Sequence, residues 1–322
     1  MSASRAAGVA VAAVLALAGC SSSDRPDAPS APRASDPPLA EMPVPRTEIA
    51  GAAWLGRIVV AGGLTADGAA SDRVDVYDPT ANRWDPAPAL PLPLHHFGMA
   101  VVGDRVYVAG GYTNEPGRWV AQAGVFSLGA GDPSWRPEPA LAQARGGLAL
   151  VATADRLVAI GGTTSAVTRS TEVLVLGRPG GWRSGPDLSE ARDHLAGASA
   201  GGRVYAVAGR VGGLETNLAT VESWDPTAGD GWRAEPRLND SRGGTSAATV
   251  GGRVCVAGGE EPAGTIASVE CLVDGRWDRV ARLAVPRHGL AVAGLGTRLH
   301  VVGGGPRPGL FVSPAHESFR SG

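Results

Sequence analysis

Short apolar runs separated by turn residues recur along this chain from about residue 40 onward. The stretch 94–139 is representative, with apolar runs at 99–102, 105–109, 124–128 and 135–137. Gly103-Asp104 separates the first two runs, and polar or glycine-rich loops separate the others. Apolar runs of this length, bounded by turn residues and without a helical period, predict four short β-strands.

This four-strand unit recurs at a fixed spacing. A tryptophan precedes a doublet of small residues by 26 positions in five places, namely Trp84 to Gly110, Trp135 to Gly161, Trp182 to Ala208, Trp232 to Gly258 and Trp277 to Gly303. From each doublet to the next tryptophan the gap varies between 19 and 25 residues. A rigid framework that carries loops of variable length is typical of binding proteins. Repeats of four antiparallel strands predict an all-β fold of the β-propeller type, with four-stranded blades.

The count of blades follows from the two ends of the chain. There are six doublets but five tryptophan anchors, and the chain after Gly303-Gly304 supplies one more third-strand segment, 316–319. Arg46 lies four residues after Met42 and 16 before Gly62, as in the other copies. We therefore predict six blades, with the stretch 38–43 acting as an N-terminal strand that joins the C-terminal blade and closes the ring.

The repeat resembles the kelch motif. The residues that carry the resemblance are Gly62-Gly63, Asp75-Val76-Tyr77-Asp78 and Trp84, and again Ala208-Gly209, Glu222-Ser223-Trp224-Asp225 and Trp232. It covers residues from about 40 to 322 and departs from the pattern at Ala208, which replaces a glycine, and at Leu94, which replaces an arginine. The resemblance implies a binding or protein-interaction role, because arginines at the matching position of eukaryotic kelch propellers bind acidic partner peptides.

The N-terminal region has the features of an export signal. Arg5 precedes an apolar run, and Leu17-Ala18-Gly19-Cys20 resembles the lipobox of bacterial lipoproteins. We expect a signal peptide at 1–20, lipidation of Cys20, a disordered Ser/Pro/Ala-rich tether at 21–37 and the propeller at 38–322. The protein would then be exported and lipid-anchored on the outer side of the cytoplasmic membrane, or be periplasmic or at the cell surface.

Charge and cysteine content add two expectations. The formal net charge of −2 does not favour a nucleic-acid partner, and we expect a monomer that meets the membrane only through its lipid anchor. Cys255 and Cys271 belong to the same repeat copy. In an exported protein they can form a disulfide between adjacent strands, or else be two buried small apolar residues.

Candidate binding residues cluster where each copy enters its first strand. In a propeller this point and the loop between strands two and three lie on the same face, around the mouth of the central channel. The residues expected there are Arg46, His95, His96, Arg145, Arg192, His194, Arg242, Arg287 and His288, with Tyr112, Asn114 and Trp119 from a long loop. An exposed ring of guanidinium groups would favour an acidic protein, small molecule or sugar. Alternatively, each arginine pairs with an acid or caps carbonyls at a blade junction.

The sequence contains no catalytic motif that we can single out. We expect no cofactor and no metal, because His288 follows its arginine by one residue and His194 by two, so that their side chains would point differently. The copper site of galactose oxidase, a kelch propeller, needs a tyrosine linked to a cysteine, which the cysteines here do not favour. The alternative to a binding module is a carbohydrate-active enzyme similar to the sialic-acid mutarotase, an epimerase-like reaction on the same face. Its acid and base would come from Glu48, Asp193, Glu260 or Glu261.

Overall fold

The computed structural model describes Met1 and residues 38–320, and the regular secondary structure from Leu39 onward consists of antiparallel strands and one 3-10 turn. The strands of the first three sheets are β1 (Ala50–Trp54), β2 (Arg57–Ala61), β3 (Val74–Asp78) and β4 (Arg83–Ala87); β5 (Gly98–Val102), β6 (Arg105–Ala109), β9 (Val125–Gly129) and β10 (Arg136–Glu138); and β11 (Ala149–Ala152), β12 (Arg156–Ile160), β13 (Thr171–Val175) and β14 (Arg183–Ser184).

The remaining three sheets repeat this pattern. Their strands are β15 (Ala196–Ala200), β16 (Arg203–Val207), β17 (Val221–Trp224) and β18 (Arg233–Glu235); β19 (Ser246–Val250), β20 (Arg253–Ala257), β23 (Ser268–Val273) and β24 (Arg276–Arg282); and β25 (Ala291–Leu295), β26 (Arg298–Val302) and β27 (His316–Arg320). The long loops add two hairpins, β7 (Tyr112–Glu115) with β8 (Arg118–Ala121) and β21 (Glu260–Glu261) with β22 (Gly264–Thr265), and one 3-10 turn, η1 (Leu214–Thr216).

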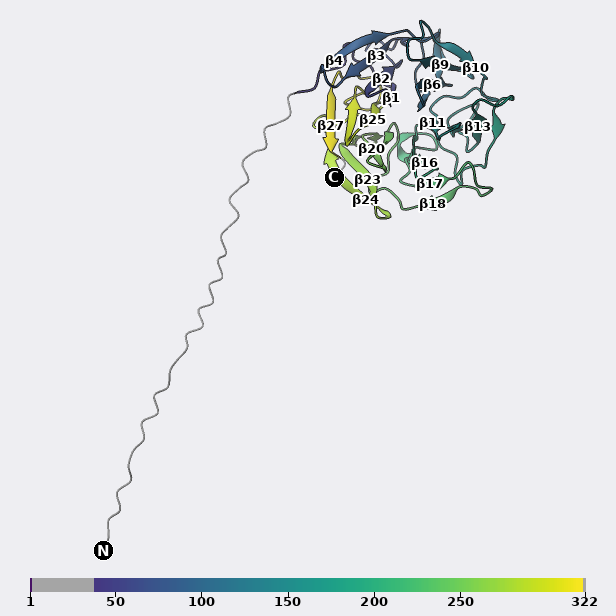
Figure 1. Ribbon diagram of the computed structural model, residues 1–322. Helices are drawn as coiled ribbons and strands as arrows, with labels where there is room; N and C mark the ends of the chain where they lie inside the picture. The colour runs from purple at the N-terminus through teal and green to yellow at the C-terminus, as the bar shows by residue number, and fades with distance from the viewer. Residues whose placement is uncertain (2–37, 321–322) are drawn as a thin grey trace. The chain divides into compact units, whose positions relative to one another are not determined.

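The six sheets are the blades of a propeller, arranged around a central axis with the first strand of each blade innermost (Figure 1). The second strand of every blade is almost completely buried, because each sheet packs both of its faces against neighbouring sheets. One apolar cluster joins Ile58 and Val60 of the first blade to Ala293 and Val302 of the last. The predicted all-β, six-bladed architecture is therefore confirmed.

Backbone hydrogen bonds tie each blade to the next around the whole ring. The N–H of the second doublet residue donates to the carbonyl at the arginine position of the following blade, as Gly111 does to Arg145 at 2.9 Å. The circuit closes where Gly304 donates to Arg46 at 2.9 Å. Glycine is favoured at the first doublet position, since a Cβ on Gly110, at φ +66°, would lie 2.5 Å from the Arg145 oxygen. In the fourth blade Ala208 takes this position with φ +57°.

The segment 38–43 closes the ring, as predicted, although it is not a regular strand. Its Met42 N–H donates to the Pro314 carbonyl at 2.9 Å, and Met42 is buried against the last blade. The indole of Trp84 donates to Ala40 O at 2.9 Å, where the other blade tryptophans bond a proline carbonyl of the preceding blade.

The fifth blade carries the one disulfide among the described residues. Cys255 of β20 and Cys271 of β23 are direct cross-strand partners, with Cα atoms 4.0 Å apart, and their sulfurs are bonded. Of the two interpretations that the sequence left open, the disulfide is therefore the correct one. The predicted signal peptide, lipidated Cys20 and tether lie outside the described residues.

Candidate functional site at the channel mouth

The arginines of the repeat lie inside the blades, so the predicted ligand-binding ring of guanidinium groups is wrong. The alternative, that each arginine pairs with an acid or caps carbonyls, is confirmed. All five are 0 % exposed, namely Arg46, Arg145, Arg192, Arg242 and Arg287. Arg145 is representative: its Nη1 donates to the carbonyl of Gly161 at 3.0 Å, and its Nη2 donates to Glu172 of the same blade at 2.7 Å. The equivalent pairs are Arg46 with Asp75, Arg192 with Glu222, Arg242 with Glu270 and Arg287 with Glu317. A buried guanidinium that a carboxylate neutralises offers nothing to an acidic ligand, which removes the basis for expecting one.

The second blade shows that the arginine and the carboxylate act as one unit. There the arginine position is Leu94, and the strand-three position that holds the carboxylate in other blades is Phe126, which pairs with Val108 as Glu172 pairs with Ala159. Leu94 and Phe126 belong to one apolar cluster. Both members of the ion pair have therefore been replaced together by apolar groups, a covariation that is readable in the sequence once the register is known.

The innermost feature of the mouth is a closed ring of six residues in the left-handed backbone conformation. They lie two positions after each arginine position, have φ between +50° and +65°, and are Glu48, His96, Gly147, His194, Gly244 and Gly289. Each N–H from His96 onward donates to the carbonyl of the preceding member at 2.8–3.2 Å, and the N–H of Ile49 closes the ring on Gly289 at 3.2 Å. These hydrogen bonds fix the backbone at all six positions, and therefore the direction in which a side chain at each position points.

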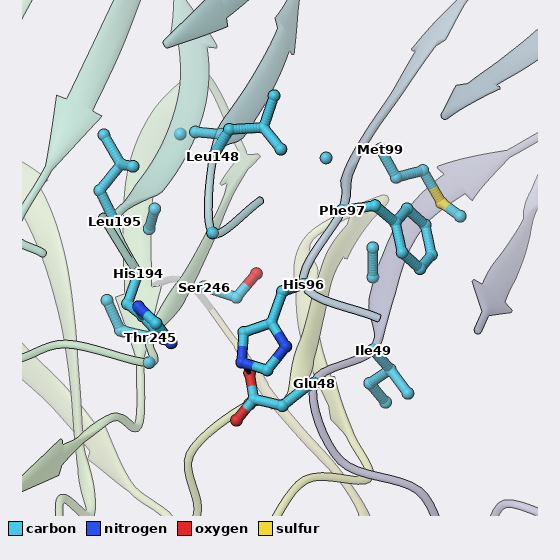
Figure 2. A pocket seen from close by; sticks show the side chains of 18 of the residues that line it. Glu48, Ile49, His96, Phe97, Met99, Leu148, His194, Leu195, Thr245 and Ser246 are labelled. Atoms are coloured by element: carbon cyan, nitrogen blue, oxygen red, sulfur yellow. Dashed lines mark ion pairs between the residues drawn. The ribbon is translucent and has the colours of Figure 1, made fainter. Parts of the chain in front are cut away.

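The three members that are not glycine bring their side chains together (Figure 2). One ligand-type atom from each of Glu48, His96 and His194 lies within 4.8 Å of the others. Glu48 Oε2 is 3.2 Å from His96 Nε2, and the two imidazole rings have centroids 5.0 Å apart. The structure therefore brings together two of the predicted histidines with Glu48, which the sequence suggested only as an acid or base of the alternative enzyme.

Burial and charge act in opposite directions on these groups. Burial lowers the pKa of His96 to about 3, although the charge of Glu48 opposes the shift. Burial would raise the pKa of Glu48, but His96 and His288 outweigh it and hold that pKa far below its usual range. Burial would also lower the pKa of His288, yet its contacts with Glu48 and the charge of Glu260 leave that pKa raised. The mouth thus pairs an ionised Glu48 with a readily protonated His288.

The surrounding side chains are acids and bases that pair with one another. His288 Nδ1 lies 3.1 Å from Glu48 Oε1 and 3.6 Å from Glu260 Oε2. Arg210 Nη1 donates to Glu260 at 2.7 Å, and His194 Nδ1 lies 2.9 Å from Asp193 Oδ1. Three of the four acids considered for the alternative enzyme are therefore already engaged in ion pairs.

The predicted loop residues lie at the rim of the same mouth. Tyr112 and Trp119 come from the hairpin β7–β8, and the Trp119 ring is 4.7 Å from that of His95. His95 Nε2 is 2.9 Å from Asn114 Oδ1. Trp119 is 54 % exposed, so this loop covers the histidines while presenting its indole to solvent.

A cavity of about 110 Å³ lies at the centre of the propeller, next to the ring (Figure 2). Glu48, His96 and His194 contribute to it, together with small strand-one residues such as Gly51 and Ser246. The polar atoms therefore meet a partly open cavity that is wide enough for a small ligand or a few waters.

The comparisons with known proteins agree with this fold. A family profile described as Kelch motif matches residues 45–91. Kelch-like protein 33 of Homo sapiens is 41% identical over 56 residues, which are 17% of this chain and 10% of that protein. Kelch-like protein 25 of Rattus norvegicus is 27% identical over 132 residues, or 39% of this chain and 22% of that protein. The aligned segment thus spans less than a quarter of either relative.

Among solved structures, one titled "Structure of YjhT" superposes with a TM-score of 0.74 at 15% sequence identity, covering 88% of this chain and 99% of that one. At this identity the likeness concerns the fold. The class of protein is accordingly a six-bladed β-propeller. One of its repeats, at residues 45–91, matches the kelch motif. No helix in the part of the chain that the structure describes is long and apolar enough to cross a membrane.

Proposed function

We propose that this kelch propeller is a binding module that recognises a protein partner through the face around the channel mouth. The observation that carries the proposal is the placement of exposed apolar side chains. Large apolar residues that are 41–54 % exposed occur on the loops between strands two and three of three blades, namely Trp119, Val211, Leu310 and Phe311. Exposed apolar residues gathered on one face mark protein-interaction sites.

Contacts between neighbouring loops make this face continuous. The Asn114 side chain donates to the carbonyl of Gly68 in the first blade at 2.8 Å. Gly68 in turn lies against Leu310 of the last blade, since a Cβ on it would be 3.1 Å from Leu310 Cδ2. Three loops from three blades thus form one surface that carries Trp119 and Phe311. Aromatic residues of this kind are favoured as anchors in interfaces.

The proposal predicts a loss of partner capture when the aromatic anchors are removed. We expect the double variant Trp119→Ala with Phe311→Ala to lose at least about tenfold in affinity for a partner cross-linked from cell-envelope extracts, since each buried anchor contributes roughly 1–2 kcal/mol. Binding would be measured by pull-down and then by titration with the purified partner.

The matched control is Leu55→Ala, which removes a 57 % exposed apolar side chain from the β1–β2 turn at the opposite ends of the strands. Equal capture by the wild type, the control and the double variant would refute the proposal. The carbohydrate-active alternative is not proposed, because its candidate acids Glu48, Asp193 and Glu260 already lie beside His288, His194 and Arg210, respectively.

We further propose that the module works outside the cytoplasm, attached to a membrane through lipidated Cys20. The lipobox-like Leu17-Ala18-Gly19-Cys20 supports this, and so does the Cys255–Cys271 disulfide, because disulfides persist in oxidising compartments. Cells fed a palmitate analogue should label the wild-type protein but not Cys20→Ser, which should leave the membrane fraction. Equal labelling of both would contradict the anchor.

A further inference from the structure

Three of the six positions in the left-handed ring at the channel mouth are glycine, and the other three carry side chains. A non-glycine residue in the left-handed conformation is strained by its Cβ, and Gly147, Gly244 and Gly289 avoid this strain. Glu48, His96 and His194 accept it. All three side chains are of types that ligate metals, and strain at several converging residues is characteristic of functional sites.

A chain of hydrogen bonds fixes which nitrogen of His96 carries its proton. The carbonyl of Gly68 accepts from Asn114 Nδ2 at 2.8 Å, which orients the amide and makes Asn114 Oδ1 the acceptor for His95 Nε2 at 2.9 Å. His95 Nδ1 is then bare and accepts from His96 Nδ1 at 2.6 Å. The lone pair of His96 is therefore on Nε2, the atom that faces the Glu48 carboxylate at 3.2 Å.

Hydrogen bonds also fix which nitrogen of His194 carries its proton. Its Nδ1 donates to Asp193 Oδ1 at 2.9 Å, and Thr163 Oγ1 donates to Asp193 Oδ2 at 2.5 Å. Among the described residues no hydrogen bond reaches His194 Nε2, so that nitrogen is the free ligand atom. A carboxylate behind a histidine in this manner is the usual second shell of a metal-bound imidazole.

We propose that Glu48, His96 and His194 form a binding site for a divalent transition-metal ion at the centre of the channel mouth. Glu48 Oε2 and His96 Nε2 are both acceptors and face each other at 3.2 Å, and His194 Nε2 offers a third free lone pair beside them. A cation between these three atoms would satisfy all of them. His288 Nδ1 lies 3.1 Å from Glu48 Oε1, so that Oε2 is the oxygen that faces His96. Two imidazoles and one carboxylate suit Zn²⁺ or Fe²⁺ and leave coordination positions open.

The geometry requires a modest adjustment on binding. Zn–N bonds of about 2.0–2.1 Å place tetrahedral ligand atoms roughly 3.4 Å apart, whereas the widest separation within the triad is 4.8 Å at most. The open positions of the ion would face the glycine half of the ring and the central cavity. The spacing of His194 and His288 after their arginines predicted no metal, because the two histidines occupy different positions of the repeat. His96 and Glu48 occupy the His194 position of their blades, and His288 does not.

The test uses Zn²⁺ and Co²⁺ with the purified full chain after treatment with a chelator. We expect one equivalent of Zn²⁺ by calorimetry and elemental analysis, and a Co²⁺ absorption spectrum that Zn²⁺ abolishes. The variants His96→Gly and His194→Gly should lose this binding. Both place glycine where the ring already uses glycine, so they should fold at least as well as the wild type.

Two further variants separate a built site from adventitious binding. Asp193→Asn should weaken Zn²⁺ affinity about 10- to 100-fold, because it removes the carboxylate that orients His194. Glu115→Gln, which removes an exposed carboxylate at the rim hairpin, should leave the affinity unchanged. Absence of saturable binding, or unchanged binding in both glycine variants, would overturn the proposal. Partner capture by the exposed loops is a separate measurement and would be unaffected by this outcome.

Discussion

At the residue scale, the repeat's arginine acts as an internal crosslink. Its side chain joins the glycine doublet, the strand-three carboxylate and the carbonyl before strand three, as Arg46 does with Gly62, Asp75 and Arg73. A planar guanidinium with five donors can satisfy several buried acceptors at once. The sequence showed that an arginine recurs, but it could not show whether the guanidinium faces solvent or the blade interior.

The second blade suggests how to test this crosslink. Arg145→Leu alone should lower the free energy of unfolding by about 3–5 kcal/mol, because it leaves the buried carboxylate of Glu172 without its counter-charge. The double variant Arg145→Leu with Glu172→Phe copies Leu94 and Phe126 and should recover most of that loss. Urea unfolding of the wild type, both single variants and the double variant measures the coupling. Additive losses would show that the two residues are independent.

At the scale of the elements, the strands were predictable and the loops were not. The predicted runs at 99–102 and 105–109 correspond to β5 and β6, because alternation and turn residues act locally. The hairpin β7–β8 within the long loop was not anticipated, although Trp119 was recognised as a residue outside the repeat. Its position over His95 depends on Gly146, where a Cβ would lie 2.2 Å from the Tyr112 ring. Such contacts come from another blade and leave no local signal.

The candidate site was predictable in part for the same reason. The sequence placed His95, His96, His194 and His288 together near the mouth, where the structure also has them. It did not single out Glu48, because the left-handed ring that groups this residue with His96 and His194 is defined by backbone angles. A comparison of the residues two positions after each arginine would have given the signal.

At the scale of the whole molecule, closure of the ring joins residues far apart in the sequence. His316 Nδ1 donates to the carbonyl of Ala40 at 3.1 Å, and His300 Nδ1 then donates to His316 Nε2 at 3.0 Å. Burial lowers the pKa of both histidines to about 4, with further lowering from nearby charges, Arg298 on His300 and His300 on His316. The closure thus requires two neutral imidazoles.

This closure predicts a loss of stability in mild acid. A histidine in the unfolded chain has a pKa of about 6.5. Below that pH, His300 and His316 are protonated in the unfolded chain but stay neutral in the folded chain. Stability should decrease as the pH falls from about 6.5 towards 4, by on the order of 3 kcal/mol for each histidine. The double variant His300→Phe with His316→Gln should show a shallower dependence in urea unfolding across this range. An unchanged slope would contradict the prediction.

The sequence by itself determined the strands, the number of blades and the way in which the N-terminal segment completes the last blade. Those features depend on spacing and on local alternation, which are written directly along the chain. The tertiary structure alone decided that the arginines lie within the blades and that Glu48, His96 and His194 converge. Burial, charge pairing and the direction of a side chain arise from contacts between blades, and residue spacing does not encode them.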